Sequence, residues 1–205
     1  MAGFEYMGVL GKEPAEALRV AGFVERGTVP RHSHRGDTGA RLPSGWFLIV
    51  GESAWTKTAQ ELSAGCQAIY LEASDTAMSS MAILWEDGRQ VWKVLREGDP
   101  SAPHEVMTEG DPPPEFHTIY AQLLEKQRAA DAEGEEVDYL YNVPVDLATA
   151  ITGYFELDPE PEGAVFTRLE RVERKPEPAP PQAAPVPPAP APAPPARDRP
   201  WWKFW

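Results

Sequence analysis

Residues 78–97, MSSMAILWEDGRQVWKVLRE, decide the fold. Two runs with apolar positions, Met78–Glu86 and Arg89–Glu97, flank Asp87-Gly88, a dipeptide that suits the two positive-φ positions of a type I′ turn. Trp85 and Trp92 bracket the turn, and aromatic and β-branched residues on paired strands help to fix their register. The stretch therefore predicts an antiparallel hairpin.

Further strands are predicted on the N-terminal side of the hairpin. Residues 46–50 (WFLIV) form a short, continuously apolar run that is typical of a central strand. Residues 67–71 (QAIYL) predict a second strand, which follows a short helix expected over 58–64. Residues 13–19 favour a helix. Residues 31–42 are polar and contain glycine, which predicts a mobile loop.

The segment after the hairpin predicts a long helix and then a strand. Apolar residues recur at helical spacing from Phe116 to Leu124, so we expect a helix over 114–130. An acidic linker over 131–136 should follow it. Residues 137–143 (VDYLYNV) combine β-branched and aromatic residues and predict another strand.

The last part of the body predicts one more helix and a closing element. Pro144 suits a helix start, and Gly153 suits a helix C-terminal cap, so residues 145–153 predict a short helix. Residues 164–171 predict a strand or a short helix. Mixed strands and two to three helices predict an α+β fold: a single domain with a largely antiparallel sheet.

Proline usage divides the chain. Of the 23 prolines, 12 fall between Pro176 and Pro200, where alanine is also frequent and large apolar residues are almost absent. We therefore expect an acidic α+β globular domain over residues 1–175, of which 1–44 is loop-rich. A disordered Pro/Ala-rich linker of polyproline II character should span 176–199, and an aromatic anchor peptide should span 200–205.

The distribution of charge along the chain limits the kinds of molecule that the protein is expected to bind. The chain carries a net charge of −13. From Pro176 onward Arg197, Arg199 and Lys203 outnumber Glu177 and Asp198 by one, so residues 1–175 carry −14. Such an acidic body repels phosphate backbones, and we expect no nucleic-acid partner.

The subcellular location is predicted from targeting signals and from cysteine usage. No secretory signal and no apolar run of membrane-spanning length is visible, and the lone Cys66, expected to be a small buried core residue, cannot form an internal disulfide. We therefore predict a cytoplasmic protein.

The histidines are the first candidates for chemistry. His32, His34 and Asp37 are residue types that ligate zinc or nickel, but no third strong ligand is predictable from the sequence, and a solvated loop is the favoured interpretation. His104, Glu105 and His117 are the residue types of a base and its orienting carboxylate, yet no nucleophile motif accompanies them. We expect no catalytic residue, no metal and no cofactor.

The aromatic anchor peptide is the strongest candidate binding element. Its residues are Trp201, Trp202, Lys203, Phe204 and Trp205. Tryptophan dominates protein–protein hot spots, which favours a pocket on a partner protein. Tryptophan is also enriched at membrane interfaces, so peripheral membrane contact is one alternative, and docking on its own domain is another.

The layout of the body resembles a known group of proteins. A Trp-flanked Asp-Gly hairpin, a helix and then residues 137–144 (VDYLYNVP) are similar to the layout of small acidic bacterial proteins, including some immunity proteins of toxin systems. This resemblance spans about residues 45–154, rests on pattern, and carries over no functional residue. It implies an acidic inhibitor of a basic toxin.

The sequence thus leads to three functional hypotheses. The leading one is a non-catalytic cytoplasmic protein-interaction module that presents the tethered aromatic peptide to a partner protein or a membrane surface. The first alternative is the immunity-like inhibitor. The second is a small enzyme centred on His104, Glu105 and His117.

Overall fold

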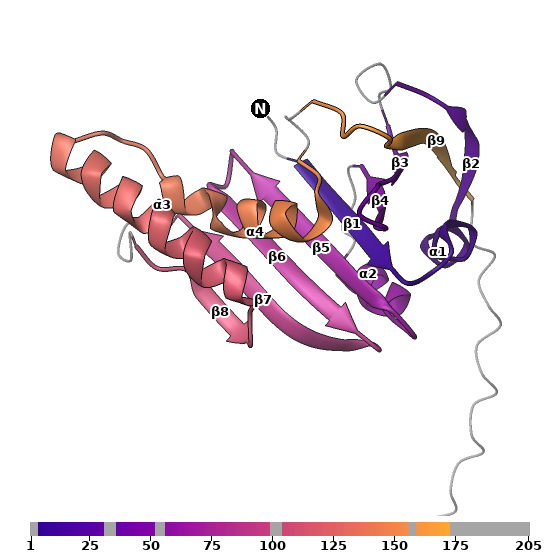
Figure 1. Cartoon of the computed structure of the whole chain (residues 1–205), viewed down its shortest axis with the longest axis horizontal. Coiled ribbons are helices and arrows are strands. Elements are labelled where there is room, and N and C mark those ends of the chain that lie inside the picture. Colours follow the sequence, from indigo (N-terminus) through magenta and orange to yellow (C-terminus); the bar gives the residue numbers. More distant parts are fainter. Residues whose placement is uncertain (1–3, 31–35, 52–55, 99–103, 156–158, 173–205) are drawn as a thin grey trace, which may run out of the picture. The chain divides into compact units, whose positions relative to one another are not determined.

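The structure is a computed structural model that describes residues 4–30, 36–51, 56–98, 104–155 and 159–172. The chain divides into two units, 1–173 and 174–205, and all the described residues belong to the first. Its strands form a nine-stranded sheet of order β2-β9-β3-β4-β1-β5-β6-β7-β8 (Figure 1). Each neighbouring pair in the sheet is antiparallel.

The element bounds are as follows. The strands are β1 (Phe4–Leu10), β2 (Phe23–Thr28), β3 (Thr38–Arg41), β4 (Phe47–Val50), β5 (Gln67–Ser74), β6 (Ser79–Glu86), β7 (Arg89–Glu97), β8 (Met107–Gly110) and β9 (Val165–Arg171). The helices are α1 (Pro14–Ala21), α2 (Thr56–Leu62), α3 (Pro114–Glu133), the 3₁₀ helix η2 (Tyr139–Tyr141) and α4 (Asn142–Thr152). The α+β fold with an antiparallel sheet is confirmed.

The hairpin of β6 and β7 forms as predicted. Asp87 and Gly88 have φ values of 50° and 76°, which is the left-handed region that a type I′ turn requires. A β-bulge lies opposite the step from Leu84 to Trp85, because Leu84 pairs with Trp92 whereas Trp85 pairs with Gln90. The bulge leaves one extra residue on β7 between Gln90 and Trp92. As a result, Trp85 and Trp92 lie in different cores, on opposite faces of the sheet.

The sheet has a helical layer on each face. Strand residues alternate between the faces, so in β1 Tyr6 joins one buried cluster and Met7 the other. The Tyr6 cluster lies under α3 and α4, and the Met7 cluster lies under α1 and α2 (Figure 1). We call these the α4 face and the α2 face.

Four predicted helical features are confirmed. A helix follows Glu13 with Pro14 as its first residue, a short helix precedes β5, and α3 starts at Pro114. Gly153 caps α4 with φ 77°, and its N–H donates to the Thr149 carbonyl oxygen. In each case a local rule about proline, glycine or helical spacing was sufficient.

Two predictions about the loops and linkers were wrong. Residues 31–42 do not form one loop, because Thr38–Arg41 is strand β3, which pairs with β4 and β9; residues 31–35 lie outside the described residues. The acidic linker begins later than residue 131, because Glu133 is the last residue of α3. Gly134, whose φ is 75°, caps the C-terminus of the helix.

The strand predicted over 137–143 was also wrong. This segment forms η2 and the first turn of α4, and α4 begins at Asn142 rather than Val145. The Asp138 side chain accepts a hydrogen bond from the Tyr141 N–H and so caps the helical turn. Leu140 and Val143 are fully buried and lie three residues apart, which is helical spacing.

The expectation of a loop-rich segment over 1–44 missed three strands, which are β3 and two others. Strand β1 lies between β4 and β5, near the middle of the sheet, and β2 forms one edge. The predicted linker 176–199 and the peptide 200–205 lie outside the described residues. Among the helices that the structure does describe, none is both long enough and apolar enough to span a membrane.

Candidate functional site

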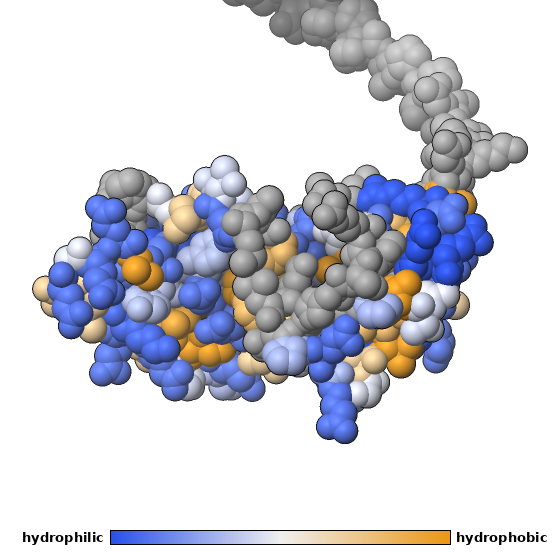
Figure 2. All heavy atoms as spheres, turned by 90° about the horizontal axis from the view of Figure 1, so that it is seen from above, coloured by the Kyte–Doolittle hydropathy of each residue, from blue (hydrophilic) through white to orange (hydrophobic). Residues whose placement is uncertain are grey.

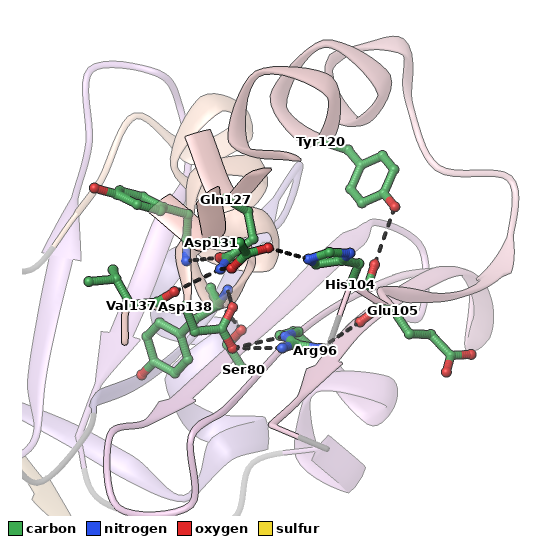
Figure 3. Close-up of polar contacts among 11 residues, drawn as sticks. Ser80, Arg96, His104, Glu105, Tyr120, Gln127, Asp131, Val137 and Asp138 are labelled. Carbon is green, nitrogen blue, oxygen red and sulfur yellow. Dashed lines mark hydrogen bonds and ion pairs between the residues drawn. The ribbon is translucent and has the colours of Figure 1, made fainter. Parts of the chain in front are cut away.

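A cluster of polar side chains joins α3 to the sheet and to α4, and it contains one of the predicted histidines (Figure 3). His104 lies in the connection between β7 and β8, and its Nε2 is 2.7 Å from Asp131 Oδ2 on α3. The Tyr120 hydroxyl donates to the His104 carbonyl oxygen at 3.4 Å. These contacts hold the connection against the side of α3.

Gln127 is the centre of the cluster. It is 6% exposed, and its Nε2 donates to Asp131 Oδ1 and to the Val137 carbonyl oxygen, both at 2.8 Å. Its Oε1 accepts from the Tyr139 N–H at 2.7 Å. Hydrogen bonds from Gln127 and from His104 lower the pKa of Asp131, so this carboxylate stays ionised at neutral pH.

An ion pair ties the end of β7 to the start of η2. Arg96 is 4% exposed, and its Nε and Nη2 atoms lie 3.0 and 2.9 Å from Asp138 Oδ2. Its Nη1 also donates to the Glu105 carbonyl oxygen at 3.0 Å. Ser80 completes the arrangement, because its hydroxyl donates to the Tyr141 carbonyl oxygen at 2.6 Å.

The cluster does not arrange His104, Glu105 and His117 as a base and its orienting carboxylate. The carboxylate next to His104 is Asp131, and the Glu105 side chain points away from the cluster (Figure 3). His117 is exposed, and its ring stands edge-on to Phe116 at 5.3 Å between centroids. The described contacts of His104 join chain segments to one another. Sequence reasoning missed Gln127 and Asp131, although their i, i+4 spacing was readable.

The second histidine candidate is only partly described. His32 and His34 lie outside the described residues, and Asp37 forms an ion pair with Arg171 Nε at 3.2 Å. Within the described ranges, no group of three or more His, Cys, Asp or Glu side chains is placed to hold a metal ion. Cys66 is half-buried rather than fully buried, and its Sγ donates to the Leu62 carbonyl oxygen.

Two carboxylates converge on a buried phenol on the α2 face. The Tyr70 hydroxyl donates to Glu5 Oε2 and to Glu72 Oε2, each at 3.0 Å. Burial, followed by the charges of these two carboxylates, raises the pKa of Tyr70 well above its ordinary value. Neutral Tyr70 therefore holds two negative side chains side by side on neighbouring strands.

The five residues of the predicted aromatic anchor, Trp201, Trp202, Lys203, Phe204 and Trp205, lie outside the described residues. We compared the chain with models of protein families, with curated proteins and with solved structures, and found no match in any of the three comparisons.

Proposed function

We propose that this chain is a non-catalytic protein-interaction module that presents an aromatic peptide on a Pro/Ala-rich tether. One observation carries the proposal: three of the seven tryptophans lie in the last five residues of the sequence, directly after 25 residues that include 12 prolines. The residues that we assign to the binding peptide are Trp201, Trp202, Lys203, Phe204 and Trp205.

The peptide has the composition of a binding hot spot. Tryptophan and phenylalanine side chains each bury roughly 150–250 Å² when they enter a pocket, and this area dominates interface energetics. In a helical peptide Trp201, Phe204 and Trp205 share one face, because they lie at i, i+3 and i+4. Lys203 and the two arginines at 197 and 199 add positive charge, which favours an acidic rim around the pocket.

The preceding segment suits a tether. At ~3.1 Å per residue in polyproline II conformation, about 25 residues span up to roughly 80 Å. Such a tether raises the effective concentration of the peptide near a partner bound to the body, without fixing the orientation of either. The body is then an anchoring platform for the peptide.

The polar cluster of the body supports a non-catalytic role. Its buried members Ser80, Arg96 and Gln127 make hydrogen bonds to chain segments of the same body. His104 contributes to the same task through Asp131. These contacts position α3 and η2 against the sheet.

The test compares full-length protein with a variant in which the four aromatic residues at 201, 202, 204 and 205 are replaced by serine. Proximity labelling in the native cells identifies neighbours, and pelleting with anionic or neutral vesicles measures membrane binding. We expect the aromatic variant to lose specific protein neighbours. Val186→Ser, which removes the one large apolar residue of the tether, is the control and should retain them. Identical neighbours for all three proteins would refute the proposal, and loss of vesicle pelleting alone would move the peptide to the membrane.

The second candidate function is an acidic inhibitor of a basic protein. The observation that favours it is the net charge of −13, which is concentrated in the body. It predicts binding that weakens as salt is raised and that survives removal of residues 200–205. Binding that is insensitive to salt would exclude it.

A further inference from the structure

One half of the α2 face carries no helix that the structure describes. Helix α2 packs on β5, β1 and β6, and α1 packs on α2 and β2. Both helices lie towards the β2 side of the sheet, away from β7 and β8 (Figure 1). The opposite face of the same strands is covered by α4, which packs on β5, β6 and β7, with α3 beside it.

Three apolar side chains form a line that starts on β6, at the side of α2, and runs over β7 and β8. Met81 of β6 pairs with Leu95 of β7, and Leu95 pairs with Met107 of β8. Directly paired residues point to the same face, so the three side chains stand next to each other. Met107 is 38% exposed, and Met81 and Leu95 are half-buried. We call Met81, Leu95 and Met107 the apolar row.

The same line continues into carboxylates. Glu72 of β5 pairs with Met81, and Glu5 of β1 pairs with Glu72. Neutral Tyr70 holds both carboxylates in place through its hydroxyl. Glu97, two residues from Leu95 on β7, is exposed on the same face. The apolar row therefore continues into Glu72 and Glu5 at its β6 end and has Glu97 beside it on β7; we call these three carboxylates the acidic rim.

One cation next to the apolar row pairs with a carboxylate outside the rim. Lys93 lies two residues from Leu95 on β7, and its Nζ is 3.2 Å from Glu109 Oε1. Seen from above, the hydrophobic residues of the body form separate patches among hydrophilic ones (Figure 2). A patch that joins exposed methionine to carboxylates is a surface for an apolar and basic ligand.

The spacing of the line fits a helix. Met81 and Met107 are two strand spacings apart, or about 9.6 Å, which matches seven residues of α-helix at about 10.5 Å. The full line from Glu5 to Met107 covers four strand spacings, about 19 Å, or roughly 13 helical residues. A helix laid across the strands therefore meets apolar side chains along one half and carboxylates along the other.

We propose that the apolar row and its acidic rim bind an amphipathic helix of a partner protein, with apolar residues over Met81, Leu95 and Met107 and Lys or Arg over Glu72 and Glu5. The helix lies beside α2, over the part of this face on which no described helix packs. This inference rests on the described residues of the body and not on the aromatic peptide. Charge disfavours a second copy of the chain as occupant, because two acidic rims would meet.

The probe is a synthetic 15-residue helix with Leu at positions 1, 4, 5 and 8 and Lys at positions 11, 12 and 15. Full-length protein is labelled at its methionine methyl groups, and each signal is assigned with single Met→Leu variants. We expect the peptide to shift the Met81 and Met107 signals and to leave Met7, which is 1% exposed in the α2-covered core, unchanged. A peptide of the same composition in scrambled order, and one with Glu in place of Lys, should produce no saturable shift.

Matched variants test whether the peptide binds this surface, rather than responding to the overall negative charge or to exposed apolar residues elsewhere. Glu5→Gln with Glu72→Gln keeps an acceptor for the Tyr70 hydroxyl and should weaken peptide binding roughly tenfold, because each ion pair with the peptide contributes up to about 1 kcal/mol. Glu125→Gln with Glu133→Gln removes the same charge from exposed positions of α3 and should change Kd less than twofold. Leu95→Ser with Met107→Ser should abolish saturable binding, whereas Val137→Ser with Val165→Ser, at exposed valines elsewhere, should leave it intact.

Several outcomes overturn the inference. The inference is wrong if the peptide does not bind, if the Glu peptide binds as tightly as the Lys peptide, or if the matched control variants lose as much affinity as the variants of the proposed surface. Shifts of Met81 and Met107 on dilution of the protein alone would make a second copy the occupant. Shifts of the same signals when residues 200–205 are deleted, without added peptide, would assign the row to the chain's own aromatic residues. The aromatic variant of the previous section tests the proposed function separately, since it leaves the row unchanged.

Discussion

Replacing the buried Arg96 of β7 by methionine should destabilise the protein more than breaking an exposed ion pair does. Arg96 is 4% exposed and its partner Asp138 has a side chain that is 15% exposed, so the change leaves a carboxylate with little solvent to stabilise it. Removal of one partner from a buried pair costs about 3–5 kcal/mol. Asp138 keeps its hydrogen bond from the Tyr141 N–H, which lessens the loss. We expect the free energy of unfolding to fall by about 3 kcal/mol.

Urea unfolding of the variant and of two partners tests this reasoning. Arg96→Met combined with Asp138→Asn removes the stranded charge and keeps an acceptor for Tyr141, so it should recover at least half of the loss. Arg26→Met breaks the exposed Arg26–Glu170 pair, whose side chains are both 54% exposed, and should cost less than about 1 kcal/mol. Equal losses for Arg96→Met and Arg26→Met, at unchanged m value, would refute the argument that burial sets the cost.

Three further predictions concern single residues. In Gly88→Ala the added Cβ has no atom within 4 Å, so the free energy of unfolding should fall by only about 1 kcal/mol, because alanine is strained at a φ of 76°. At Gly110, whose φ is 73°, an added Cβ would also overlap the Val91 carbonyl oxygen. Gly110→Ala should therefore cost more and should raise amide exchange in β8 ahead of β6; equal exchange in both strands would contradict this. Because the pKa of Tyr70 is raised in the folded protein, only the unfolded chain loses this phenolic proton just above pH 10. The contribution of Tyr70 to the free energy of unfolding is therefore fully present below pH 10 and decreases as the pH rises above 10. Tyr70→Phe should reduce that fall by up to ~1.4 kcal/mol per pH unit, measured by urea unfolding between pH 9 and 11, and an unchanged slope would exclude the effect. Burial raises the pKa of the Cys66 thiol, so its reaction with a thiol reagent at pH 8 should be slower in the folded protein than in urea; equal rates would show that the thiol is not shielded.

Local chemistry was sufficient for much of the body. The Asp87-Gly88 turn, the start of α3 at Pro114 and the cap at Gly153 were all readable, because each depends on the φ preferences of one or two residues. The segment 137–143 was misread for the opposite reason. Its aromatic and β-branched residues suit a strand locally, but Leu140 and Val143 bury on one side when the segment is helical.

The candidate site was less predictable than the fold. His104 stood out as a residue type with chemistry, yet its partner Asp131 is 27 positions away and lies on another element. The apolar row draws its members from three strands and was invisible in sequence, because Met81, Leu95 and Met107 become neighbours only through strand pairing. Each of them alone reads as an ordinary strand residue.

The sequence by itself determined the hairpin, the start of α3 at Pro114, the end of α4 at Gly153, the acidic balance and the concentration of aromatic residues after the Pro/Ala-rich stretch, since all of these depend on residues close together in the chain. Only the tertiary structure decided the order of the strands and which face each helix covers. Thr38 pairs with Arg168, and the Tyr6 hydroxyl contacts Thr152 across 146 positions, and such contacts form only when two distant segments bury the same face. Their register is set by that shared burial, which no local propensity encodes.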